Sequence, residues 1–296
     1  MTRAAGLLLL VCALASGCRE SPIPDGKPLV VASFFPMYDF AHQVAADRAQ
    51  VISLVPPGVH GHDWEPSPQD VAQVRRASVF VYNGAGFEPW ADKLIKEAAG
   101  PSTVVVAASA GLTIARTGGD GGVDPHVWLD PVLAKGEVEA IRGALERGDP
   151  AGKAAYAANA EAYGVKLAAL DTRFATGLRD CARREVVVSH AAFGYLTRRY
   201  RLEQIAVMGL APQAEPSPAA LAAIVRTARE RKVDAIFLEP LVSPRLAETL
   251  AREVGVRLQT LNPIEGVTRQ EATEGTGYLE LMARNLESLR EGLGCK

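Results

Sequence analysis

Short apolar runs alternate with segments of helical periodicity along this 296-residue chain, and this alternation restricts the fold more than any other feature. The runs are Leu29–Ala32, Val51–Val55, Val79–Tyr82, Val104–Ala107, Val186–Ser189, Gln204–Val207, Ala235–Leu238 and Arg257–Thr260. Strands that alternate with helices form parallel sheets, since each parallel connection needs a crossover. We therefore predict an α/β protein.

The two halves of the chain carry the same series of motifs. Each half has a strand with a serine at or just after its end, a helix with Phe and Tyr, a second strand, a loop with Pro and Gly, and then Glu-Pro-Ser-Pro, at 65–68 and 215–218. Each Ser-Pro pair is a helix start, with serine as the N-cap and proline at the first helical position. We predict two lobes of similar fold, at 29–148 and 181–296.

A long helix is expected between the lobes. Asp149-Pro150 is a favourable helix start. An apolar stripe follows at spacings of three and four, which is the helical period. Its members are Tyr156, Ala160, Tyr163, Leu167, Leu170, Phe174 and Leu178. The pattern predicts a rigid connecting helix over 149–180, about 45 Å long for about thirty residues at the α-helical rise.

The N-terminus has the features of a secretory signal. Arg3 precedes an apolar stretch from Ala4 to Ala15, and Ser-Gly then leads to Cys18. The stretch is too short to span a membrane as a mature helix. It predicts a signal peptide at 1–17, lipidation of Cys18, and a flexible Pro- and Gly-containing tether at 18–28. An ordinary cleaved leader is the alternative.

The remaining cysteines and the charge pattern limit the function further. Once Cys12 leaves with the leader and Cys18 is acylated, Cys181 and Cys295 are left, and we predict that they form a disulfide in an oxidising compartment. Basic and acidic residues number 32 and 34, and they form no block of one sign. Nothing therefore points to nucleic-acid binding.

Three of the five histidines lie in loops that follow predicted strands or precede helices. They are His62, His126 and His190. Ligands of open α/β sheets bind beyond the carboxyl ends of the strands, so three imidazoles from such loops can converge there. Imidazole suits zinc, whereas carboxylate-rich mixtures suit manganese better. Asp124 or Glu65 can orient a ligand ring by accepting its second N–H.

Three motifs around these histidines resemble those of the zinc/manganese solute-binding proteins of bacterial ABC importers (cluster 9, ZnuA/TroA-like). The stretches are Pro57–Pro68 (PGVHGHDWEPSP), Asp124–Pro131 (DPHVWLDP) and Ser189–Tyr195 (SHAAFGY). The resemblance covers about Leu29 to Leu293 and implies that His62, His126 and His190 bind the metal. Manganese-handling relatives tend to carry glutamate at the third position, so His190 points to the zinc type.

The fourth ligand is the point at which the sequence departs from the family. Many relatives have an aspartate after the last strand of the second lobe, where this chain has Asn262. Glu239 is the favoured carboxylate because it follows a strand whose end should face the cleft; its other possible role is to support a ligand histidine. Water, the carbonyl of Asn262 and Glu265 are the alternatives.

The resemblance implies a non-enzymatic protein that binds metal between its lobes. It would capture zinc outside the cytoplasmic membrane, as a monomer anchored by its lipid, and deliver it to an ABC permease. Manganese or iron import and a metal-stabilised surface adhesin are the alternatives. A zinc hydrolase is disfavoured because the chain has neither a His-Glu-x-x-His helix nor a nucleophile elbow.

Overall fold

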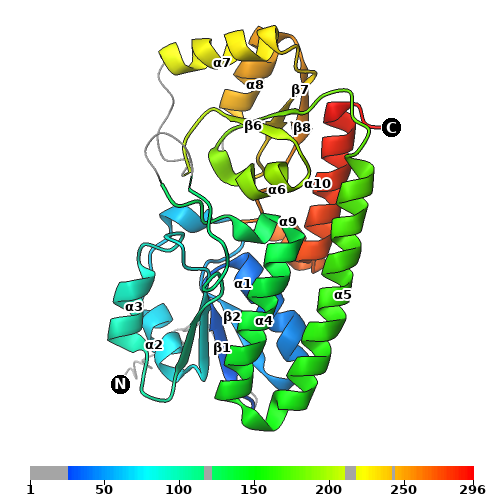
Figure 1. Cartoon of the computed structure of the whole chain (residues 1–296). Coiled ribbons are helices and arrows are strands. Elements are labelled where there is room, and N and C mark those ends of the chain that lie inside the picture. The colour runs from blue at the N-terminus through cyan, green and yellow to red at the C-terminus, as the bar shows by residue number, and fades with distance from the viewer. Residues whose placement is uncertain (1–25, 117–121, 211–217, 242–243) are drawn as a thin grey trace, which may run out of the picture.

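The computed structural model describes residues 26–116, 122–210, 218–241 and 244–296 (Figure 1). The signal peptide, Cys18 and most of the tether lie outside these ranges, as do residues 215–217 of the second Glu-Pro-Ser-Pro motif. The strands are β1 (Leu29–Ala32), β2 (Gln50–Ser53), β3 (Val79–Tyr82), β4 (Val104–Ala107), β5 (Glu185–Val188), β6 (Glu203–Ala206), β7 (Ala235–Leu238) and β8 (Arg257–Thr260).

Within the described ranges the strands form two parallel sheets with the same order. The first sheet runs β2-β1-β3-β4 and the second runs β6-β5-β7-β8. The inner strand β1 is buried along its whole length, as is typical of a parallel strand covered on both faces. The structure thus confirms two similar α/β lobes.

Helices cover both sheets. They are α1 (Phe35–Ala45), α2 (Pro68–Arg76), α3 (Ala91–Ala98), α4 (Pro131–Gly148), α5 (Lys153–Gly177), α6 (Gly194–Arg199), α7 (Pro218–Glu230), α8 (Arg245–Val254), α9 (Arg269–Glu274) and α10 (Tyr278–Leu293). The first Glu-Pro-Ser-Pro motif starts α2 as expected, since Ser67 caps the helix and forms a capping box with Asp70.

The connecting helix α5 runs beside both lobes (Figure 1). It begins at Lys153 rather than at Asp149, because Pro150–Gly152 form a 3₁₀ turn and the Asp149 carboxylate instead accepts hydrogen bonds from Arg48 and Tyr156. The predicted apolar stripe of α5 is buried in one continuous core that includes residues of both lobes. At 25 residues, the helix is about 37 Å long.

The C-terminal helix α10 packs beside α5 and is fastened at its end (Figure 1). Cys181 follows α5, Cys295 follows α10, and the two form a disulfide as predicted, 114 residues apart in sequence. Backbone hydrogen bonds from Ala182 to Gly294 and from Lys296 to Asp180 flank it. In the described ranges, none of the helices combines the length and the apolar character needed to cross a bilayer.

Candidate metal site

His62 comes from the loop after β2. It lies in the 3₁₀ turn Gly61–Asp63, and its ring centroid is 4.5 Å from that of Phe87. The turn comes so close to Phe87 that a Cβ on Gly61 would lie 2.9 Å from that ring, so glycine is required there. The close approach fixes the path of the chain next to His62.

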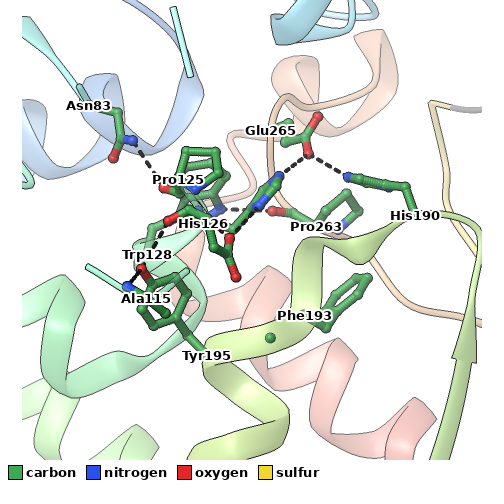
Figure 2. A network of polar contacts seen from close by, with 12 residues as sticks. Asn83, Ala115, Pro125, His126, Trp128, His190, Phe193, Tyr195, Pro263 and Glu265 are labelled. Atoms are coloured by element: carbon green, nitrogen blue, oxygen red, sulfur yellow. Dashed lines mark hydrogen bonds and ion pairs between the residues drawn. The ribbon is translucent and has the colours of Figure 1, made fainter. Parts of the chain in front are cut away.

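His126 lies in the loop before α4, at the start of the 3₁₀ turn Val127–Leu129. Its Nδ1 lies 2.9 Å from Asp124 Oδ1, and its backbone N–H donates to the same oxygen. The loop is held further by Asn83, whose side chain donates to the Pro125 carbonyl (Figure 2). With Nδ1 bound to Asp124, the Nε2 lone pair is left to face the site.

His190 directly follows β5 and Ser189. Its Nδ1 lies 2.7 Å from Glu239 Oε2, and its backbone N–H donates to Glu239 Oε1. Glu239 directly follows β7, the neighbour of β5. The carboxylate of Glu239 therefore orients the ring of His190 from behind, just as Asp124 orients His126.

Glu265 lies in the loop that follows β8, and Asn262 shapes that loop. The Asn262 side chain accepts a hydrogen bond from the backbone N–H of Ile264, and its backbone is held by Asn285 on α10. Ile264 has φ of 58°, a left-handed conformation that is costly for a β-branched residue. This turn aims Glu265 towards the histidines.

The side chains of His62, His126, His190 and Glu265 converge. One donor atom from each lies within 4.8 Å of all the others. The Oε1 of Glu265 is 3.5 Å, 3.2 Å and 3.0 Å from the Nε2 atoms of His62, His126 and His190, and the first two Nε2 atoms are 3.4 Å apart. Figure 2 shows Glu265 between His126 and His190.

Four of these separations are close to those expected around a tetrahedral zinc ion. A tetrahedron whose corners lie about 2.0–2.1 Å from its centre, the usual zinc–nitrogen distance, has edges of about 3.3–3.4 Å. Four of the six edges have lengths of 3.0–3.5 Å, around that value, and every donor pair lies within 4.8 Å. The donors are three imidazole nitrogens, each of which can be neutral, and one carboxylate oxygen. Four protein ligands are the number found in a structural zinc site that holds no water.

The site is buried and electrostatically coupled. Burial raises the pKa of Glu265, but its contacts with His126 and His190 outweigh burial and hold that pKa well below its usual range. Burial lowers the pKa of His190, but hydrogen bonds to Glu239 and Glu265 raise it to about 10. The pKa of His126 is raised in the same way by Asp124 and Glu265. A cation that enters the site must therefore displace protons.

Comparisons with known proteins identify the family. The sequence model described as "ZnuA: Zinc-uptake complex component A periplasmic" matches residues 30–292. The chain is 36% identical over 300 residues to the high-affinity zinc uptake system protein ZnuA of Bacillus subtilis, which covers 97% of this chain and 94% of that protein. The chain belongs to the ZnuA family.

Two further ZnuA-like relatives have informative descriptions. The zinc-binding lipoprotein AdcA of Streptococcus pneumoniae is 37% identical over 96% of this chain, which spans only 60% of AdcA. Its Zn(II)-bound ZnuA-like domain superposes with a TM-score of 0.80 at 38% identity, over 90% of this chain and 99% of that one. The laminin-binding protein Lmb of Streptococcus agalactiae, described as having adhesin and metal transporting activity, has a TM-score of 0.82 at 34% identity, over 90% and 99%.

The structure brings together most of the residues that the ZnuA-like motifs point to. The three motif histidines meet at one point, and Asp124 contacts His126. The side-chain oxygen of Asn262 accepts a hydrogen bond from the backbone N–H of Ile264 in its own turn. Glu65 is exposed in a cavity of about 550 Å³ that His62 and Trp64 also line. That Glu65 orients a ligand ring stays a prediction.

Proposed function

We propose that this chain captures zinc outside the cytoplasmic membrane and delivers it to an ABC permease. The observation that carries the proposal is the convergence of four donor atoms, three of them on buried residues, with four of their six separations close to the edges of a zinc tetrahedron. Zinc is the ion to be transported, and the three imidazoles and one carboxylate are the groups that would bind it. Membership of the ZnuA family supports the transport role.

Within this proposal the ligands are His62, His126, His190 and Glu265. Glu265 is preferred to Glu239 as the fourth ligand because its Oε1 faces three Nε2 atoms at once. Glu239 contacts Nδ1 of His190, the ring nitrogen opposite the one that faces the site. We assign Glu239 and Asp124 the role of fixing the two rings.

Zinc is preferred to manganese or iron for two reasons. Three nitrogen donors favour a borderline cation over a hard one, which prefers oxygen. The donor atoms also match four-coordinate geometry, whereas manganese shares the oxygen-rich, octahedral preference of magnesium. Zinc-binding names among the relatives point the same way.

We further propose that the mature chain is a monomer anchored to the membrane through lipid on Cys18. The Ser-Gly-Cys sequence that ends the leader supports the anchor, and the description of AdcA as a lipoprotein agrees with it. Metabolic labelling with a radioactive fatty acid tests this: Cys18→Ser should abolish incorporation while leaving secretion of the polypeptide measurable.

Competitive titration and growth together test the function. The secreted protein should bind zinc more tightly than manganese in chelator competition, and His126→Ala should lose this binding while the exposed His42→Ala variant keeps it. A bacterium that lacks its own binding protein but carries the cognate permease should grow in zinc-depleted medium with the wild type and not with His126→Ala. Growth that does not depend on the protein, together with attachment to laminin, would instead favour the adhesin role described for Lmb.

A further inference from the structure

A fourth histidine, His60, lies against the back of Glu265. Its Nε2 is 2.9 Å from Glu265 Oε2, and its side chain is only 14% exposed. The ring is thus mostly buried although His60 lies in a loop, only two residues from His62. The Gly58 N–H donates to the Val267 carbonyl, which ties the loop of His60 to the loop of Glu265.

The two oxygens of Glu265 thus have different neighbours. Oε1 faces the Nε2 atoms of the three motif histidines, whereas Oε2 faces His60. A carboxylate can bind a cation through one oxygen or through both, and binding through both raises the coordination number. The Nε2 of His60, in ion-pair contact with Oε2 at 2.9 Å, occupies the space beside that oxygen and limits rotation of the carboxylate.

Resting on the proposed function, we propose that His60 is a positioning residue that keeps Glu265 a one-oxygen ligand and so favours four-coordinate zinc over manganese. With Oε2 held, the site offers three nitrogens and one oxygen, which is a complete set for zinc. It is an incomplete set for a cation that prefers six oxygen-rich ligands. Releasing Oε2 would add the donor that such a cation lacks.

His60 acts through Glu265 and not as a ligand itself. The donor atoms that all lie within 4.8 Å of one another, among the described residues, come from His62, His126, His190 and Glu265 and do not include His60. The ring centroid of His60 is 5.6 Å from that of His62 and 6.3 Å from that of His190. The ring therefore flanks the donor set on the side of Oε2.

Two substitutions of His60 test the proposal. His60→Ala removes the N–H donor, and His60→Gln keeps an N–H donor of similar reach. Chelator competition gives the zinc and manganese dissociation constants, and the visible absorption of bound Co²⁺ gives the geometry, since tetrahedral Co²⁺ absorbs strongly and higher-coordinate Co²⁺ weakly. His42→Ala, which removes an exposed histidine of α1, is the matched control.

We expect His60→Ala to lower the zinc-over-manganese preference by about 10–100-fold, the usual effect of an outer-shell partner on affinity, and to weaken the Co²⁺ absorption. His60→Gln should restore most of both, and His42→Ala should change neither. Equal loss of both affinities with an unchanged Co²⁺ spectrum, no change at all, or a Gln variant as impaired as the Ala variant would each overturn the proposal. Failure of the wild type to bind zinc would instead defeat the proposed function.

Discussion

Replacing Glu265 by glutamine is the sharpest test of the ligand set. The amide keeps the size and the carbonyl oxygen of the side chain but removes its charge. Glu265 is 1% exposed and its Oε1 lies within 3.5 Å of three Nε2 atoms. Breaking a buried charge pair by removing one partner costs about 3–5 kcal/mol. At about 1.4 kcal/mol for each tenfold change, zinc should bind roughly 10²–10⁴ times more weakly.

Glu239→Gln is the matched control. Glu239 is also 1% exposed and also contacts His190, but it does so at Nδ1. The glutamine carbonyl can still accept the hydrogen bond that Glu239 Oε1 accepts from the His190 backbone N–H. We expect a loss of about 10–100-fold, as for other outer-shell partners. Glu239→Gln thus alters the contact at Nδ1 of His190, whereas Glu265→Gln alters the contact at Nε2 of the same ring.

Competition with a fluorescent zinc chelator at one fixed pH measures both losses. Thermal unfolding of the metal-free proteins, with circular dichroism of their helices, establishes that each variant is folded before its affinity is compared. The expected order is wild type, then Glu239→Gln, then Glu265→Gln. An affinity of Glu239→Gln at or below that of Glu265→Gln would mean that the fourth ligand has been assigned to the wrong carboxylate.

The remaining predictions concern protons, the disulfide, a buried acid and lobe motion. Because the metal-free pKa of His190 is about 10, zinc must displace a proton from it throughout the neutral range. Zinc affinity should therefore rise about tenfold per pH unit from pH 6 to pH 8. An affinity that levels off near pH 7, as for an ordinary histidine with a pKa of about 6.5, would contradict this. Replacing Cys181 and Cys295 by serine should lower the free energy of unfolding by about 2–5 kcal/mol in denaturant titrations. An unchanged free energy of unfolding would show that the disulfide does not stabilise the fold. Burial raises the pKa of Glu88 from 4.5 to about 7, so the native state favours the protonated carboxyl. The free energy of unfolding of the metal-free protein should therefore fall by about 3 kcal/mol as the pH rises from 4.5 to about 7. Glu88→Gln should remove this pH dependence. Small-angle scattering should give the same radius of gyration with and without zinc, and a large closure would contradict the rigid connection.

The fold was accessible from the sequence because its signals are local. Five strands have the bounds that the sequence predicts, namely Leu29–Ala32, Val79–Tyr82, Val104–Ala107, Ala235–Leu238 and Arg257–Thr260. Apolar runs and crossover helices leave little choice of topology. The start of α5 was less accessible, because the tertiary contacts of Asp149 with Arg48 and Tyr156 decide it.

The site was accessible only in part. The motifs identify the three histidines that converge, and the structure adds what no spacing reveals, namely which carboxylate faces them. Glu239 and Glu265 both follow strands of the second sheet. Their different roles depend on the turn at Asn262 and on the left-handed backbone of Ile264, which swing Glu265 inward. The same turn gives His60 its partner, Glu265, a contact that no spacing in the sequence predicts.

The connection between the lobes constrains how the ion can leave. One continuous core, the length of α5, and the hydrogen bond from Trp128 to the Pro263 carbonyl across the two halves all oppose a wide opening. His126 and His190 are each fixed from behind by a buried carboxylate. His62 is instead 8% exposed and lines the cavity beside Trp64. Exchange is therefore expected to begin at His62, since moving one short loop disturbs far less packing than separating two lobes.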